Sequence, residues 1–142
     1  MKQKNISQRI KEGFEQQGFM HLIKAEMLSA GAGKCVIRVP YNENLTQQNK
    51  FFHGGVTGTL ADNSAGFAAY SLMKEDEKPL TVEFKINLVN KAVGAYLQSE
   101  AEVLKAGRLL KVCESRVYTI SEEGEKTLCA VALVTISTMI PR

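Results

Sequence analysis

The sequence predicts an α+β protein in which a curved antiparallel sheet wraps around a central helix. Several segments alternate apolar and polar residues and are separated by short turns, which is typical of antiparallel hairpins. One segment, residues 53–73, contains mostly small and apolar side chains, so we expect a largely buried helix there. Small residues along this helix allow other backbones to approach closely, as in a sheet that curls around it.

The composition is that of a globular protein, which we expect to form one domain over residues 1–142. Hydrophobic residues make up 44% and charged residues 23% of the chain, which excludes disorder and low complexity. The net charge is +3 and the basic residues are scattered, so no nucleic-acid partner is indicated. Three cysteines lack CxxC spacing and a nearby histidine, so we expect no metal and no disulfide framework, only reduced core thiols: Cys35, Cys113 and Cys129.

The N-terminal segment predicts an amphipathic helix over about residues 4–18. Its apolar residues Ile6, Ile10 and Phe14 recur at every fourth position and draw one apolar stripe, so the helix should pack on the domain as a lid. This segment has no apolar core and contains two glutamates, which argues against a secretory signal or transit peptide. We therefore expect a cytoplasmic protein.

Residues 20–39 predict two strands joined by a turn at Gly31-Ala32-Gly33. The polar residues 42–50 predict a loop, and the central helix is expected over about residues 54–73. A transmembrane span is an alternative for this stretch, but four glycines, several hydroxyl residues and Asp62 interrupt the apolar run, so we expect no membrane partner.

The C-terminal half predicts four strands. Residues 80–88 alternate and should form a strand with one apolar face, whereas residues 96–106 and 109–120 should form a hairpin that turns at Ala106-Gly107. Residues 128–136 are apolar on both faces, which favours a central strand. The element order is thus helix, two strands, helix and four strands, with no internal repeat or linker.

The start of the central helix is a candidate oxyanion site. His53 precedes the glycine pair Gly54-Gly55, and glycines leave the backbone N–H groups of a helix start uncovered. Such amides can hold an anion or the oxygen of a polarised carbonyl. We expect His53 to support this site, with proton transfer as the alternative.

Asp62 is the candidate catalytic carboxylate. It is the one charged residue between Lys50 and Lys74, and burying an ionised carboxylate without partners is costly. Either Asp62 is a partnered structural residue or it serves as general base or nucleophile.

The residues His53-Gly54-Gly55, Leu60-Ala61-Asp62-Asn63 and Gly66 closely resemble the hotdog-fold acyl-CoA thioesterases, particularly the phenylacetyl-CoA thioesterase-like group. The resemblance spans about residues 45–138. It implies the hotdog fold and an enzyme that hydrolyses acyl-CoA thioesters without a further cofactor, since coenzyme A is part of the substrate. It also implies a homodimer, or a dimer of dimers, because in this family the carboxylate and the glycine amides of one site come from different subunits.

The resemblance also assigns roles to individual residues. It implies that the Gly54 or Gly55 amide polarises the thioester carbonyl, that Asp62 is the nucleophile or general base, and that Thr81 positions the attacking water. In the family an asparagine often stands six residues before the histidine, where this chain has Gln47.

The substrate's two ends suggest further candidate residues. Three cations bracket the turn between the expected strands 96–106 and 109–120. They are candidate contacts for CoA phosphates, or simply keep the turn soluble: Lys105, Arg108 and Lys111. Four aromatic side chains could line an apolar acyl tunnel between subunits, or pack in the core: Phe51, Phe52, Phe67 and Tyr70. The same residues are compatible with two alternative functions. One is a non-catalytic acyl-CoA-binding protein, and the other is a hydratase or dehydratase of the same fold.

Overall fold

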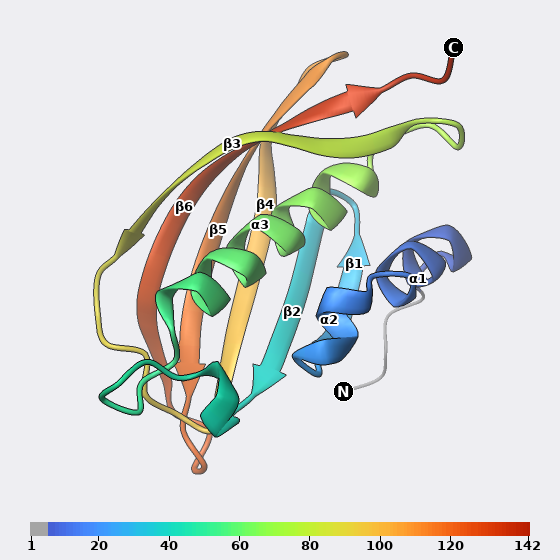
Figure 1. Ribbon diagram of the computed structural model, residues 1–142. Coiled ribbons are helices and arrows are strands. Elements are labelled where there is room, and N and C mark those ends of the chain that lie inside the picture. Colours follow the sequence, from blue (N-terminus) through green and yellow to red (C-terminus); the bar gives the residue numbers. More distant parts are fainter. Residues whose placement is uncertain (1–5) are drawn as a thin grey trace.

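The computed structural model, which describes residues 6–142, contains one six-stranded antiparallel sheet that curves around a long helix (Figure 1). The sheet order is β1-β2-β4-β5-β6-β3, so β1 and β3 are the edge strands. The helices are α1 (Gln8–Glu15), α2 (Gly18–Leu22), the short 3-10 helix η1 (Glu43–Leu45) and α3 (Gly54–Tyr70). The strands are β1 (Glu26–Gly31), β2 (Lys34–Pro40), β3 (Lys78–Leu88), β4 (Tyr96–Ala106), β5 (Leu110–Ile120) and β6 (Lys126–Met139). The expected α+β hotdog fold is confirmed.

Helix α3 is the centre of the core. It lies across the concave face of the sheet (Figure 1), and its small residues Ala61, Ala65 and Ala68 are fully buried. Side chains of β2, β4, β5 and β6 pack against it from the sheet, among them Ile37 and Leu97, both fully buried. Small helix residues thus allow the sheet to approach closely on this side.

The N-terminal region differs from the single helix expected over about residues 4–18. Helix α1 ends at Glu15 and a second short helix, α2, follows, whereas Met20–Leu22 had been expected to begin a strand. Met20 and Ile23 are both buried, and their spacing of three residues suits a helix that packs one side inward. The part of the expectation that covers residues 4 and 5 lies outside the described residues.

The far end of α3 also differs from the expectation. The helix was expected to reach residue 73 but ends at Tyr70, and tighter turns follow. The Arg9 guanidinium of α1 donates to three carbonyl oxygens at this end: Tyr70 O at 3.1 Å, Met73 O at 2.5 Å and Lys74 O at 2.6 Å. Tyr70 is the last residue of α3, and Met73 and Lys74 lie in the turns that follow it. Carbonyl oxygens at a helix C-terminus carry partial negative charge, so the cation both caps this end of α3 and fixes α1 on the domain.

Both hairpins predicted from the alternating segments are present. Strands β1 and β2 are joined through Ala32 and Gly33, which both have positive φ (51° and 78°), as a tight two-residue turn requires. Strands β4 and β5 form the other hairpin, with Ala106 opposite Lys111. Strand β6 is interior, as expected, but among residues 6–142 only one of its faces is covered, and Leu133 on the other face is 51% exposed.

Candidate active site

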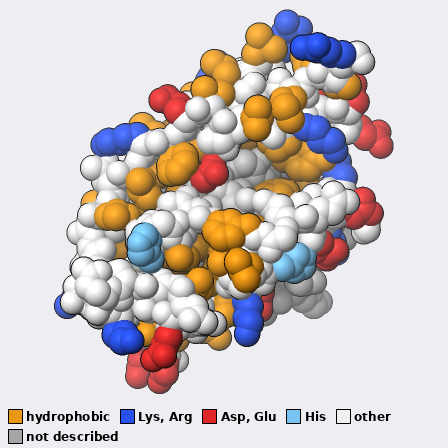
Figure 2. Space-filling model, viewed as in Figure 1, with side chains coloured by type: hydrophobic (Ala, Val, Ile, Leu, Met, Phe, Trp, Pro, Cys, Tyr) orange, Lys and Arg blue, Asp and Glu red, His pale blue; other side chains and the backbone are white. Residues whose placement is uncertain are grey.

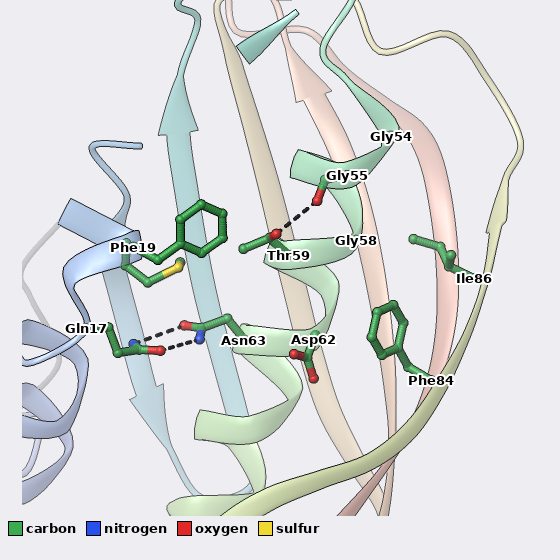
Figure 3. Close-up of a pocket in the computed structure, with 11 residues that line it drawn as sticks. Gln17, Phe19, Gly54, Gly55, Gly58, Thr59, Asp62, Asn63, Phe84 and Ile86 are labelled. Carbon is green, nitrogen blue, oxygen red and sulfur yellow. Dashed lines mark hydrogen bonds between the residues drawn. The ribbon is translucent and has the colours of Figure 1, made fainter. Parts of the chain in front are cut away.

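Asp62 faces β3 from the third turn of α3. Its carboxylate is half-buried, and Thr81 of β3 donates a hydrogen bond of 2.6 Å from its hydroxyl to Asp62 Oδ1. The carboxylate borders a cavity of about 470 Å³, here called the glycine cavity, which extends to Gly54 and Gly55 at the start of the helix (Figure 3). Asp62 is therefore bonded to a neutral hydroxyl and open to a cavity, and none of the ion pairs among residues 6–142 includes it.

His53 caps the start of α3. Its side-chain Nδ1 accepts the Gly55 N–H at 2.8 Å, so a neutral His53 ring carries its proton on Nε2. The N–H groups of Val56 and Thr57 donate to the His53 carbonyl oxygen. In the part of the chain that the structure describes, no partner is found for the Gly54 N–H. One amide of the glycine pair is thus available to a ligand, where the sequence had suggested either or both.

The two glycines are needed for close contacts. A Cβ atom at Gly54 would lie 3.1 Å from Leu88 Cδ1 of β3, and one at Gly55 would lie 2.9 Å from His53 Nδ1. A side chain at Gly55 would therefore displace the capping ring, whereas a side chain at Gly54 would only press on the flexible end of Leu88. The glycine pair lets β3 and the histidine cap approach the first turn of the helix.

Gly54 and Asp62 lie on the same helix but too far apart to share one carbonyl group. They are eight residues apart, which corresponds to about 12 Å along a helix axis that rises ~1.5 Å per residue. Figure 3 shows them on separate turns. A carboxylate and an amide that act on one reacting carbonyl must both lie within ~3 Å of its atoms. A second copy of one of these groups is needed to complete such a site.

A β-bulge places Thr81 on the inner face of the sheet. Thr81 pairs with the buried Ile136, but Glu83 pairs with the next partner residue, Thr135, so Val82 is an extra residue without a partner. The bulge changes which residues of β3 point inward, and the single apolar face expected over residues 80–88 does not form. Leu80 pairs as an outward-facing residue, whereas Phe84, beyond the bulge, faces α3.

Two side-chain amides join the N-terminal helices to α3 beside the carboxylate. Asn63 Nδ2 donates to Gln17 Oε1 at 2.7 Å, and Gln17 Nε2 donates to Asn63 Oδ1 at 3.4 Å (Figure 3). Gln17, Asp62 and Asn63 border both the glycine cavity and a second cavity of about 630 Å³, here called the Gly66 cavity, between α1, α3 and the start of β3. The sequence pointed to Asn63 only as part of the motif around Asp62 and did not point to Gln17, because their contact joins positions 46 residues apart.

The other predicted site residues lie in several places. Gln47 does not border the glycine cavity: its side-chain oxygen accepts the Asn49 N–H, and it lines a separate cavity of about 160 Å³ that also reaches Gly54. Lys105 and Arg108 are exposed near the β4–β5 turn. Lys111, by contrast, is 5% exposed, and its Nζ donates to Gly107 O at 3.1 Å and Thr138 Oγ1 at 2.9 Å. The Lys111 ammonium thus bonds within the chain and not at the surface.

The four aromatic candidates for a tunnel wall are also separated. Phe67 and Tyr70 line the Gly66 cavity. Phe51 and Phe52 line the small cavity next to Gln47, and Phe52 is 3% exposed with Tyr41 packed edge-on at 5.6 Å between ring centroids. The structure therefore brings two of the four aromatics to a cavity that Asp62 borders.

The cysteines do not provide a nucleophile. All three are buried free thiols, and burial raises the pKa of Cys113 and of Cys129 to about 11 and that of Cys35 further still. Among residues 6–142 no three His, Cys, Asp or Glu side chains are grouped so that they could hold a metal ion. No helix in the same range is long and apolar enough to cross a bilayer.

Comparisons with known proteins agree with this architecture. The family model described as the thioesterase superfamily matches residues 49–126, more than half of the chain. The 1,4-dihydroxy-2-naphthoyl-CoA hydrolase of Listeria monocytogenes serotype 1/2a (strain 10403S) is 29% identical over 112 residues, which cover 79% of this chain and 89% of that protein. Solved structures also match. A thioesterase family protein from Silicibacter pomeroyi superposes with a TM-score of 0.91 at 36% identity, covering 94% of this chain and 98% of that one.

A more distant solved structure shows the same fold. The PaaI protein of E. coli, from the phenylacetic acid degradation operon, superposes with a TM-score of 0.80 at 15% identity and covers 93% of this chain and 91% of its own. The matched segment 49–126 includes the glycine pair, Asp62 and Thr81. With its six-stranded sheet around α3, the chain belongs to the thioesterase superfamily.

Proposed function

We propose that the protein hydrolyses acyl-CoA thioesters. The observation that carries this proposal is the Asp62 carboxylate, held by the Thr81 hydroxyl and open to a cavity that leads to the free Gly54 amide. Membership in the thioesterase superfamily supports a thioester hydrolase, and the similar Listeria protein is named as a CoA hydrolase.

The residues suit the chemistry of thioester hydrolysis. The Gly54 N–H at the positive end of α3 would donate to the thioester carbonyl oxygen and stabilise the charge that develops on it. Asp62 would accept a proton from a water whose oxygen attacks the carbonyl carbon. The tetrahedral intermediate would then collapse by breaking the carbon–sulfur bond, and the thiolate of CoA would take up the proton. In the alternative route the Asp62 carboxylate attacks the carbonyl carbon itself, the carbon–sulfur bond breaks and the CoA thiolate leaves. Water then hydrolyses the resulting mixed anhydride and regenerates the Asp62 carboxylate.

The active unit we propose is a homodimer, because one chain holds its own amide and carboxylate about 12 Å apart. Strand β3 supports this proposal because it is an edge strand of 11 residues. A long, apolar edge strand exposes unpaired backbone groups and apolar side chains, which a second chain can cover. Figure 2 shows hydrophobic side chains at the surface on this side of the molecule. Four apolar side chains of β3 are exposed, with these exposed fractions: Leu80 (55%), Val82 (59%), Phe84 (43%) and Leu88 (58%). Pairing of two β3 edges would cover this surface, and two dimers could assemble further.

The exposed cations of the β4–β5 turn are our candidates for CoA phosphates. Lys105 and Arg108 are free to meet a phosphate, and Arg can bind it through two N–H groups. Lys111 has its ammonium engaged by Gly107 and Thr138, so it supports the turn and does not reach the surface.

The test is release of free thiol from acyl-CoA by the purified protein. Asp62→Asn should lower kcat by at least 100-fold, a loss of about 2.7 kcal/mol of transition-state stabilisation. Asp76→Asn is the matched control, because Asp76 is the chain's other aspartate and lies exposed in the charged loop before β3. Full activity of Asp62→Asn would refute the proposal. Tight binding of acyl-CoA by the wild-type protein without thiol release would instead identify a non-catalytic binding protein, and hydration of an enoyl-CoA would identify a hydratase.

A further inference from the structure

The Gly66 cavity is larger than the glycine cavity, at about 630 Å³ against about 470 Å³. It lies between α1, the second half of α3 and the first residues of β3, and Asp62 and Thr81 border it. Most of its lining is apolar, and the apolar residues include Phe67, Tyr70 and Leu80. A cavity of this size and lining is typical of sites for small apolar ligands, which occupy about 300–1,000 Å³.

Gly66 creates part of this space. It lies four residues after Asp62, one turn further on the same side of α3. A Cβ atom built at Gly66 would meet no other atom within 4 Å, whereas one at Gly54, Gly55 or Gly58 would meet a side chain within 3.7 Å. Gly66 is also absent from the residues with positive φ, so the backbone does not require glycine there. Glycine inside a helix is destabilising relative to alanine. Neither packing nor backbone geometry explains this cost, but the cavity does.

The opposite wall is also built with a glycine. Gly13 of α1 faces Phe67 and Tyr70, and a Cβ atom there would lie 3.6 and 3.8 Å from their rings. Helix α1 is held at this position by Arg9 at the end of α3 and, through the segment that follows it, by the Gln17–Asn63 amide pair. Each of the two helices thus contributes one glycine to the cavity wall, and the contacts of Arg9 and Gln17 fix the position of α1 relative to α3.

We propose that the Gly66 cavity receives the acyl group of the substrate and that Gly66 and Gly13 set the largest acyl group accepted. This inference rests on the proposed thioester hydrolysis and adds a substrate class: thioesters with bulky apolar acyl groups, such as an aryl group or a medium-length chain. With the carbonyl at Asp62, the acyl group extends along α3 toward Tyr70, and CoA leaves on the other side of the carboxylate.

The test compares kcat/KM for acetyl-CoA, octanoyl-CoA and benzoyl-CoA. Gly66→Leu fills the space next to Asp62 and should lower kcat/KM for octanoyl-CoA and benzoyl-CoA at least 10-fold more than for acetyl-CoA. Gly18→Leu is the matched control, because a Cβ at Gly18 also meets no atom within 4 Å, yet Gly18 lines neither cavity. It should change all three values by the same factor. Gly13→Val narrows the cavity from α1 and should give the same selective loss, even if Gly66→Leu does not fold.

Three results would overturn the inference. Equal losses for all three thioesters would place the acyl group elsewhere. A change of oligomeric state in Gly66→Leu, measured by light scattering, would show that a second copy of the chain fills the cavity. Selective loss in Gly18→Leu would show that the variants act by a general disturbance of the N-terminal helices. If the wild-type protein releases thiol and Asp62→Asn does not, the proposed function stands whatever these variants show.

Discussion

The Thr81 hydroxyl donates a hydrogen bond of 2.6 Å to the Asp62 carboxylate, and this contact depends on the bulge at Val82. Without the extra residue, Thr81 would share a face of β3 with the outward-facing Glu83. The bulge lets the strand present Thr81 to the helix while Phe84 also faces inward two pairs further along. Bulges next to functional sites commonly re-aim a side chain in this way.

Thr81 should contribute to turnover through this hydrogen bond. We expect Thr81→Val, which keeps the shape and removes the hydroxyl, to lower kcat/KM for thioester hydrolysis about 10-fold, since hydrogen bonds to charged groups contribute ~1.5–3 kcal/mol. Thr81→Ser keeps the donor and should stay within about 3-fold of wild type. Steady-state thiol release measures both. Full activity of Thr81→Val would mean that the hydroxyl does not contribute, and a loss confined to Thr81→Ser would mean that the β-branched shape matters instead.

The sequence predicted the fold well where local patterns and burial agree. Alternation in β4 and β5 predicted their hairpin, and the uncharged stretch around Asp62 predicted α3. Pattern failed in β3, because a bulge leaves no mark in the alternation of Leu80, Val82 and Phe84. It failed again in α2, where a helix of five residues buries Met20 and is followed by the buried Ile23, in a stretch too short for a clear period.

The sequence named residues that the structure places beside cavities, but it did not predict their contacts. Asp62 and the glycine pair border the glycine cavity, and Asp62 and Thr81 border the Gly66 cavity. The Gly55 N–H donates to the His53 side chain and is therefore not available to a ligand. This contact depends on the rotamer of His53, which the spacing of residues in the sequence does not indicate. The sequence predicts a surface cation at Lys111, but its ammonium is buried and donates to Thr138 of the neighbouring strand β6. A contact between two strands is not visible in the local pattern of either strand.

Arg9 should stabilise the fold as the cap of α3. Its guanidinium donates to three carbonyl oxygens and stacks over the Tyr70 ring at 4.5 Å. We expect Arg9→Met to lower the free energy of unfolding by about 1–3 kcal/mol, because the carbonyls lose a charged donor while the apolar stem stays. Arg9→Lys should recover part of this loss, since one ammonium cannot reach all three oxygens. Urea unfolding followed by circular dichroism measures both variants, and unchanged stability of Arg9→Met would contradict the cap.

The buried thiols should make the protein less stable at alkaline pH. Burial raises the pKa of Cys113 and of Cys129 from 9.0 to about 11, so the folded chain keeps protons that the unfolded chain loses. Between about pH 9 and pH 11 the unfolded state binds fewer protons, and the free energy of unfolding falls as pH rises. We expect a shallower fall in Cys113→Ala and Cys129→Ala than in wild type, each compared with its own value at pH 7. Identical slopes would show that other groups cause the alkaline loss.

Mixing two inactive variants should reveal whether one active site uses two chains. Gly54→Pro removes the one free amide of the helix start. Proline suits the first helical position, and His53 already has the extended backbone (ψ 139°) that a residue before proline adopts. We expect Gly54→Pro to fold, with its ring against the flexible end of Leu88, and to lose at least 100-fold in kcat.

Co-expression of Gly54→Pro with Asp62→Asn, each with its own tag, then separates the two arrangements. If amide and carboxylate come from different chains, each mixed dimer has one site with both groups intact, and a random mixture recovers about a quarter of wild-type activity. Mixed dimers isolated through both tags should recover about half. If both groups act within one chain, every site lacks one of them and activity stays at the level of the single variants. That result would remove the reason for a shared site, whereas recovery in the doubly tagged dimers would show that Gly54 of one chain and Asp62 of the other act in the same site.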